Sequence, residues 1–168
     1  MTKRTQKFLL VGCVSVVAIT VLLVAIARFA TLWNADVFIF SNIDECKTIE
    51  NRSVGTGSFT NYQDSTQDDC LQGLSYISFY AGKYSSNQLK FELFAYEFDD
   101  VTSSRRYFEY ITGKNTERME QNFSISSGMI TARIVAYSNN HAYAVYCPTN
   151  NLPDVMQILE EVFTVKIK

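Results

Sequence analysis

The sequence predicts an α+β fold: an N-terminal transmembrane helix followed by an antiparallel sheet, in the order β-β-α-β-β-α, with the helices packed on one face of the sheet. Three observations lead to this prediction: an apolar run near the N-terminus, two pairs of strand-like segments joined by short polar turns, and a segment with helical hydrophobic spacing after each pair. The expected parts are a basic tail at 1–7, a membrane-spanning helix at 8–33, a loop-rich segment at 34–73 and an α+β core at 74–168.

The apolar run extends from Phe8 to Ala27 without a charged residue and follows three basic residues in the tail 1–7. About twenty helical residues span the roughly 30 Å of bilayer hydrocarbon, and basic residues ahead of the span favour a cytoplasmic N-terminus. We therefore expect a single-pass membrane protein that is anchored through residues 8–33 and carries an extracytoplasmic C-terminal domain.

Two other interpretations of the N-terminus remain open at this point. The residues Ala25-Ile26-Ala27 have the small-x-small form that signal peptidase cleaves, which would release the domain. The residues Leu10-Val11-Gly12-Cys13 spell a lipobox, but few apolar residues precede Cys13 and many follow it. All three interpretations place the rest of the chain outside the cytoplasm.

The exported part is acidic. Of the 15 Lys and Arg residues four precede Asn34, whereas all 17 Asp and Glu residues follow it, so this part carries a net charge near −6. Nucleic acids are bound through basic patches, and we therefore expect no nucleic-acid partner. The many Tyr and Phe residues are sufficient for a buried core.

Three cysteines lie beyond the apolar run: Cys46, Cys70 and Cys147. Disulfides persist outside the cytoplasm, and closing the polar stretch between Cys46 and Cys70 would stabilise the fold by roughly 3–4 kcal/mol in the chain-entropy model. Cys46–Cys70 is the candidate disulfide, and three unpaired, buried cysteines are the alternative. Beside a Cys46–Cys70 bond, Cys147 is expected to be the unpaired thiol.

The first predicted hairpin joins 74–84 to 89–98 through the polar residues 85–88. Pairing outward from that loop sets Phe79 opposite Phe94, and both faces of this hairpin are apolar. A helix of about ten residues should follow, with Thr102 or Ser103 as its N-cap and Gly113 at its end. Residues 114–127 are expected to form a polar loop.

The second predicted hairpin joins 129–138 to 141–147 through Asn139-Asn140, residues that tolerate the positive φ of a two-residue turn. Alternation separates two faces, and we expect the first to be the core face. It holds Ile130, Ala132, Ile134, Ala136, Tyr143, Val145 and Cys147, and the other holds Thr131, Arg133, Val135, Tyr137, Ala142, Ala144 and Tyr146. Pro153 opens the last helix, whose apolar stripe should pack on the sheet.

No residue pattern predicts a cofactor or a metal site. His141 is the single histidine, and the scattered cysteines lack zinc-ligand spacing. Carboxylates cluster at 64–69 and 97–100, and a pair of them could act in glycoside hydrolysis. The alternative is a structural role without catalysis: the first cluster would lie in a solvated loop and the second at a helix N-terminus.

The expected function is therefore non-enzymatic: a binding or assembly module of the cell envelope with a protein or glycan partner. Arg133, Tyr137 and Tyr146 on the second face are the candidate contact surface, because tyrosine offers contact area at low entropic cost. One alternative is a hydrolase of surface glycans that uses a carboxylate pair. Another is a type II surface glycoprotein, since Asn51 and Asn122 begin Asn-x-Ser sequons.

Overall fold

The computed structural model describes residues 19–20, 36–50, 53–61, 73–118 and 121–167. The chain divides into two compact units, Met1–Ala35 and Asp36–Lys168. Within the first unit Ile19 and Thr20 are described, and both are helical. The residues described here include no helix that is long and apolar enough to cross a membrane. Most of the span predicted at 8–33 lies outside the described residues, so the anchor stays a prediction.

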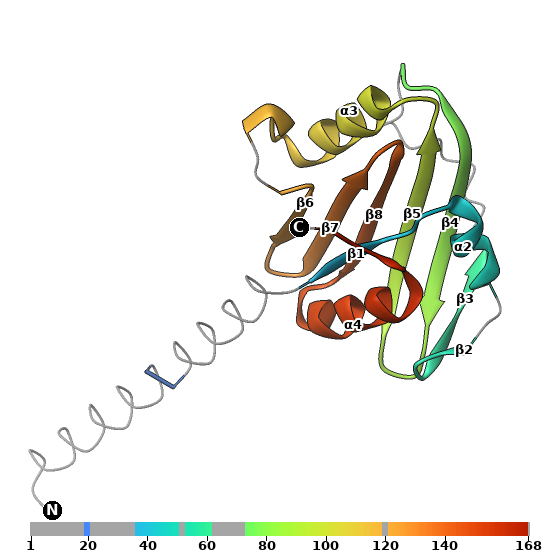
Figure 1. Ribbon diagram of the computed structural model, residues 1–168. Coiled ribbons are helices and arrows are strands. Elements are labelled where there is room, and N and C mark those ends of the chain that lie inside the picture. The colour runs from blue at the N-terminus through green and yellow to red at the C-terminus, as the bar shows by residue number, and fades with distance from the viewer. Residues whose placement is uncertain (1–18, 21–35, 51–52, 62–72, 119–120, 168) are drawn as a thin grey trace, which may run out of the picture. The chain divides into compact units, whose positions relative to one another are not determined.

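The unit Asp36–Lys168 is an α+β domain built on a seven-stranded antiparallel sheet, as the sequence predicts (Figure 1). The strand order is β2-β3-β4-β5-β8-β7-β6, and β1 pairs with β9 in a separate two-stranded sheet. The strands are β1 (Val37–Ile39), β2 (Ser53–Val54), β3 (Gly57–Asn61), β4 (Tyr76–Ser85), β5 (Lys90–Phe98), β6 (Phe123–Ser127), β7 (Thr131–Ser138), β8 (His141–Pro148) and β9 (Val165–Ile167). The helices are α2 (Ile43–Thr48), α3 (Val101–Thr112) and α4 (Leu152–Val162), with the 3-10 turns η2 (Thr116–Arg118) and η3 (Thr149–Asn151).

The β7–β8 hairpin has the predicted turn and register. Ser138 pairs with His141, and Asn139 takes the positive φ of 53° that the two-residue turn requires. The two faces are composed as predicted, except that Ile130 lies before β7 and is 82% exposed instead of belonging to the core.

The β4–β5 hairpin differs from its predicted register by two residues. Phe79 pairs with Tyr96, and Ala81 pairs with Phe94. The cause lies in the turn, where the Ser86 hydroxyl accepts hydrogen bonds from the backbone N–H groups of Gln88 and Leu89 and thereby moves the loop one position along the chain. A shift of two residues preserves the alternation of side chains, so the side chains of β4 from Ser78 onward stay on their expected faces. A bulge between Tyr76 and Ser78 places the Tyr76 ring beside Phe79 and Tyr96, whereas regular alternation would place it with Tyr80.

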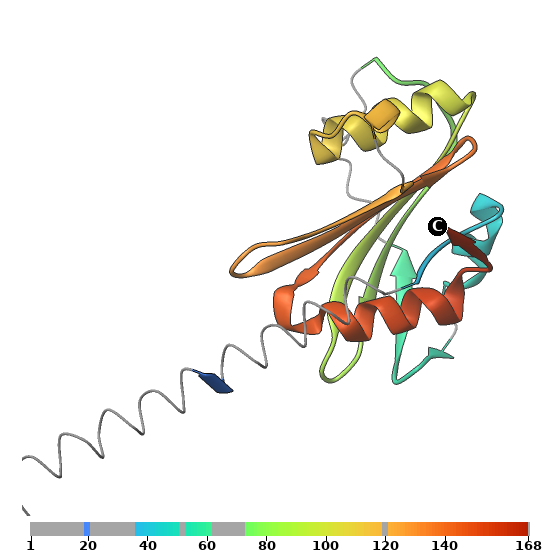
Figure 2. The ribbon, with the colours of Figure 1, turned by 60° about the vertical axis from the view of Figure 1, so that its left-hand side comes forward.

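The prediction that the helices pack on one face is wrong, because the sheet is covered on both faces (Figure 2). Helix α3 packs on β5, β7 and β8 from one side. Helices α4 and α2 and strand β1 pack on the other side, against β8, the β4–β5 pair and β7 respectively. The physical reason is that the central strands are apolar on both faces, so each face needs a covering layer.

The α3 side of the sheet holds an aromatic core. Tyr107 and Phe108 of α3 are fully buried against Tyr96 and Tyr137, which stand on β5 and β7. Helix α3 is amphipathic, and its N-cap is Asp100, whose side chain accepts a 2.7 Å hydrogen bond from the Ser103 N–H. The predicted cap at Thr102 or Ser103 was therefore placed two or three residues too late.

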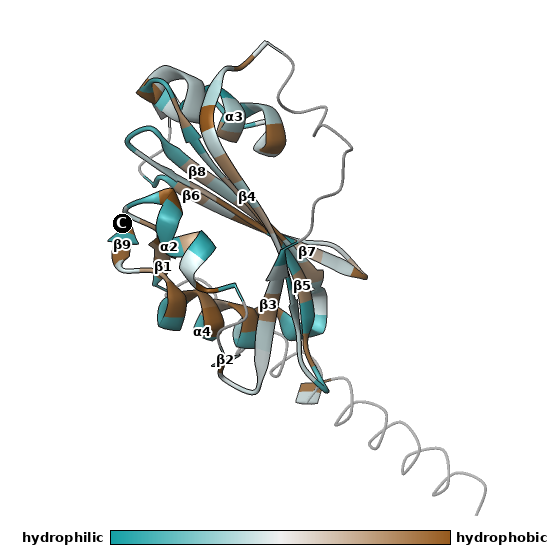
Figure 3. Cartoon of the chain, turned by 90° about the vertical axis from the view of Figure 1, so that its right-hand side faces the viewer, coloured by the Kyte–Doolittle hydropathy of each residue, from teal (hydrophilic) through white to brown (hydrophobic). Residues whose placement is uncertain are grey.

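The opposite side is closed by α4 together with the β1–β9 pair. Tyr143 of β8 is fully buried, its hydroxyl donates a 2.8 Å hydrogen bond to the Phe38 carbonyl of β1, and its ring lies 5.3 Å from that of Phe163. Hydrophobic residues recur along α4 and along the strands it covers (Figure 3). Strand β1 therefore fixes the start of the domain to its core.

Two segments that were expected to be loops contain regular structure. The segment 34–73 contributes β1, α2, β2 and β3, and the segment 114–127 contributes η2 and β6. The first of these elements, Val37–Ile39, follows directly on the start of the described domain.

Candidate interaction site

A row of side chains crosses the sheet on the α3 side, one from each of six adjacent strands. The strand register places them next to one another: Thr60, Lys83, Glu92, Tyr146, Arg133 and Ser126. We call this set the cross-strand row. It is mostly charged or aromatic, whereas sheet positions closer to α3 carry the buried aromatic core.

The cross-strand row lies beyond the part of the sheet that α3 covers. Arg133 and Tyr146 are half-buried, whereas Tyr137 and Ala142, four residues away along β7 and β8, are buried beneath the helix. In the described part of the chain, every side chain of the row is thus half-buried or exposed.

Within the row, Lys83 and Glu92 form an ion pair of 3.5 Å between Nζ and Oε1. Arg133 stands directly opposite Tyr146 and forms no ion pair with a described residue. The ring of Tyr146 meets that of Phe94 edge-on at 6.0 Å. This contact holds the Tyr146 ring against the border of the aromatic core.

A shallow groove of about 340 Å³ runs along the middle of the row, where Lys83, Glu92 and Tyr146 line it. It is lined by Lys83, Lys90, Phe91, Glu92, Ile130, Thr131, Tyr146, Cys147 and Pro148. Exposed Ile130 adds an apolar contact at the rim. The buried Cys147 behaves as a small hydrophobic side chain, as expected, because burial raises the pKa of its thiol to about 11.

Tyr137, the third residue of the predicted contact surface, does not belong to it. Its side chain is only 6% exposed, and its ring packs against Phe108 at 5.0 Å. The prediction failed here because the second face of the hairpin is itself a core face over half of its length. Arg133 and Tyr146 are adjacent and accessible, and they stay the candidate contacts.

The histidine occupies a different end of the sheet. His141 Nε2 lies 3.7 Å from Glu97 Oε1, and its ring packs on Phe40 at 5.1 Å. Burial lowers the pKa of His141, although the neighbouring Glu97 carboxylate acts in the opposite direction. The thiol of Cys46 is not activated, because desolvation by burial raises its pKa.

The structure describes one of the two carboxylate clusters. The cluster at 64–69 lies outside the described residues. In the second cluster Asp100 caps α3, and the backbone N–H of Ser103 lowers the pKa of that carboxyl, opposite to what a general acid needs. Among residues 36–50, 53–61, 73–118 and 121–167 there is also no group of three or more His, Cys, Asp or Glu side chains that could hold a metal ion.

The predicted disulfide joins a described cysteine to one outside the described residues. Cys46 in α2 is fully buried and forms no disulfide with a described cysteine, and Cys70 lies in the segment 62–72 that the structure does not describe. The Cys46–Cys70 bond stays a prediction. Of the two sequons, Asn51 also lies outside the described residues, and Asn122 is half-buried directly before β6.

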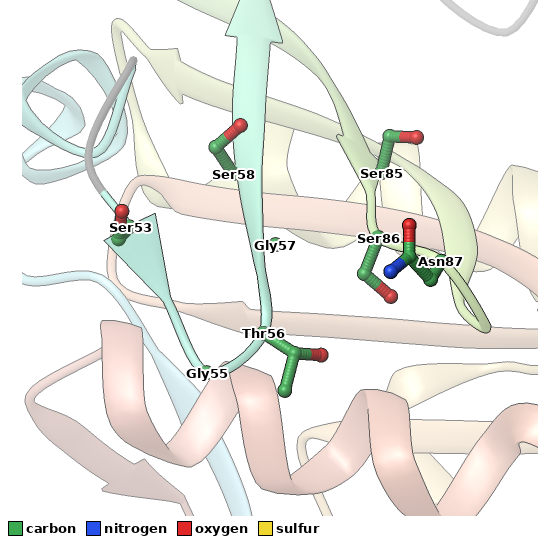
Figure 4. Close-up of a pocket in the computed structure, with 8 residues that line it drawn as sticks. All are labelled: Ser53, Gly55, Thr56, Gly57, Ser58, Ser85, Ser86 and Asn87. Atoms are coloured by element: carbon green, nitrogen blue, oxygen red, sulfur yellow. The ribbon is translucent and has the colours of Figure 1, made fainter.

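A second hollow, of about 490 Å³, lies between the β2–β3 turn and the β4–β5 turn (Figure 4). Its lining is Ser53, Gly55, Thr56, Gly57, Ser58, Ser85, Ser86 and Asn87, without a charged or aromatic side chain. A Cβ on Gly57 would stand 2.5 Å from the Ser85 carbonyl, so glycine is required for these strands to approach. The Ser86 hydroxyl is already used within its own turn. The hollow is therefore a gap between two turns, and its lining has no charged or aromatic side chain that would recognise a ligand.

No family model matches the chain, and no curated protein sequence matches it. Among solved structures, it is similar to the extracellular domain of PknH from Mycobacterium tuberculosis, with 12% sequence identity and a TM-score of 0.39. The alignment covers 73% of this chain and 92% of that one. A likeness at this level carries no inference about function.

Proposed function

We propose that the chain is a membrane-anchored, extracytoplasmic binding module without enzymatic activity, and that it binds a protein partner through the cross-strand row around Arg133 and Tyr146. The observation that carries the proposal is the accessible pairing of these two side chains beside the groove that Ile130 borders. The export of the domain rests on the apolar run at 8–27 and the basic residues ahead of it.

The composition of the row supports a protein partner. Arg and Tyr are enriched among the residues that contribute most to protein–protein affinity. The Arg133 guanidinium forms no ion pair with a described residue and is therefore available to a carboxylate of a partner. A guanidinium binds a carboxylate through two parallel hydrogen bonds. The Lys83–Glu92 pair, next to Tyr146 in the row, supplies alternating charge, which favours one partner orientation over others.

A glycan hydrolase is the less favoured alternative. Such an enzyme needs one carboxyl group with a raised pKa and a second at a fixed distance. Asp100, the member of the second acid cluster with a defined structural role, has a lowered pKa and serves as a helix cap. The Asn-x-Ser sequons keep a type II surface glycoprotein as a further alternative, which mass spectrometry of the native protein would test at Asn122.

The binding proposal is tested by crosslinking partners to the chain in intact membranes and comparing single variants. Arg133→Ala and Tyr146→Ala should each lower the yield of one and the same crosslinked partner by about tenfold or more, as expected of residues central to an interface. Each variant should keep the circular dichroism spectrum and the oligomeric state of the parent chain.

Tyr110→Ala is the matched control, because Tyr110 is a tyrosine of α3 that is 64% exposed and lies outside the row. It should leave the yield unchanged. If Arg133→Ala and Tyr146→Ala leave the yield unchanged as well, the row is not the binding surface. If a purified chain hydrolyses cell-wall glycans and loses that activity on replacement of a carboxylate, the non-enzymatic role is wrong.

A further inference from the structure

We propose that the outer edge of β6 is a dimerisation edge, on which a second copy of this chain adds its own β6 as an antiparallel strand. This inference does not depend on the cross-strand row, because it concerns backbone groups at the end of the sheet and not the side chains on its face. Figure 1 shows β6 at the end of the sheet opposite to β3 and β2.

Strand β6 is paired on one side only among the described residues. It pairs with β7 from Phe123↔Ala136 to Ser127↔Ala132, without a register shift, and no described strand pairs with its other side. An exposed strand edge presents a row of unpaired N–H and C=O groups, which is a template for another strand.

The hydrogen bonds to β7 identify the backbone groups that face outward. The N–H of Tyr137 donates to the Asn122 carbonyl, and the N–H of Gly128 donates to the Thr131 carbonyl, both at 3.0 Å. In an antiparallel pair, residues that bond to the neighbouring strand alternate with residues that do not. Residues 122, 124, 126 and 128 therefore bond to β7, and Phe123, Ile125 and Ser127 direct their N–H and C=O groups to the open edge.

The sequence and pairing of strand β6 lack three of the features that protect an edge. Natural edge strands are blocked by charged side chains, by proline or by a bulge. The sequence Phe-Ser-Ile-Ser-Ser has no charge and no proline, and its pairing with β7 is regular. Both the position of β6 at the end of the sheet and its uncharged, proline-free sequence therefore favour the addition of another strand.

The strand is complementary to itself when the two-fold axis passes through Ile125. In that register Ile125 meets Ile125 of the second copy, and Phe123 meets Ser127, so a large side chain stands opposite a small one. Each of these three residues then donates and accepts one backbone hydrogen bond across the interface. A two-fold interface of this kind closes on itself, which limits the assembly to a dimer with one continuous sheet.

Side chains on the α3 side of β6 leave room for the second copy. Ser124 and Ser126 would stand opposite each other across the axis, and both are small. The Ser124 hydroxyl accepts a 2.9 Å hydrogen bond from Lys114 Nζ, which places one ammonium near the interface in each copy. Added salt should therefore not dissociate the dimer, because screening reduces the repulsion of these like charges.

The test uses Ile125→Cys in the full chain in its own membrane. Residues opposite each other in a bonded antiparallel pair have Cα atoms about 5.5 Å apart, within the roughly 4.4–6.8 Å that a disulfide needs. Mild oxidation should convert Ile125→Cys into a covalent dimer at a yield several-fold above that of the unmodified chain, whose own cysteines set the background. Ile130→Cys lies on the β6–β7 turn away from the axis and is more exposed than Ile125, and it should stay at background.

A second variant tests the same edge without a crosslink. Ile125→Lys sets two like charges directly opposite each other, which is unfavourable between paired strands, and it should raise the dimer dissociation constant by about tenfold or more in analytical ultracentrifugation in detergent. Ile125→Thr keeps an uncharged β-branched side chain and should dimerise like the parent. Both variants should melt near the parent temperature.

The proposal is overturned if Ile125→Cys gives no more covalent dimer than the parent, or if Ile125→Lys dimerises like Ile125→Thr. A crosslink from Ile125→Cys to a different protein would also overturn it, and would assign the edge to a foreign strand.

Discussion

The ring of Phe108 in α3 packs on the ring of Tyr137 in β7, with centroids 5.0 Å apart. This contact joins the helix to the sheet and separates two tyrosines that look equivalent in the sequence. Tyr137 is buried, whereas Tyr146 is half-buried at the border of the same core. One residue therefore stabilises the fold, and the other is available to a partner.

The first prediction contrasts these tyrosines. Tyr137→Ser should lower the free energy of unfolding by about 3–5 kcal/mol, because it removes a buried ring and leaves a cavity beside Phe108. Tyr146→Ser should cost about 1 kcal/mol, since solvent already reaches that side chain. Urea unfolding of the two single variants measures both values. Equal losses would mean that Tyr146 is also a core residue, and the contact surface would then be restricted to Arg133.

The second prediction concerns acid. The pKa of His141 is lowered by burial in the folded protein, so the unfolded chain binds the proton more tightly. Stability should therefore fall as the pH falls from about 7 through the ordinary histidine pKa of about 6.5 towards the lower folded value. Urea midpoints at pH 7.5 and 5.5 measure this loss.

The control for the acid effect is His141→Gln, which has no titrating ring and should lose less stability over the same interval. Carboxyl groups with lowered pKa values, such as those of Asp100 and Glu109, change the stability of the protein at lower pH. They therefore affect the comparison between pH 7.5 and pH 5.5 little. The account of His141 is contradicted if parent and variant respond equally, or if the parent gains stability at pH 5.5.

The β7–β8 hairpin could be predicted from sequence because its turn and its alternation agree. Asn139-Asn140 allows one turn, and the register then assigns every side chain to a face. The β4–β5 hairpin has several polar residues between its strands, so two turn positions satisfy the same pattern, and the hydrogen bonds of Ser86 select one. Strand β6 was missed because its alternate serines resemble a polar loop.

The two-sided covering of the sheet depends on contacts that the sequence does not display. Alternation showed apolar residues on both faces of the hairpins, but only the packing assigns α3 to one side and α4 with β1 to the other. The candidate site was predictable in part. Arg133 and Tyr146 follow from one hairpin, whereas Lys83 and Glu92 join them through the register of two further strands, β4 and β5.

The central claim is that the domain lies outside the cytoplasm on a membrane anchor, and protease accessibility in sealed membranes tests it most directly. Cells are made permeable to protease on their outer side while the cytoplasmic membrane stays sealed, and a tag precedes Met1. At a protease concentration that digests the domain in detergent, the account predicts that residues after about 34 are lost while the N-terminal tag stays protected in the membrane fraction. Survival of the domain until lysis, with the tag removed first, would contradict it.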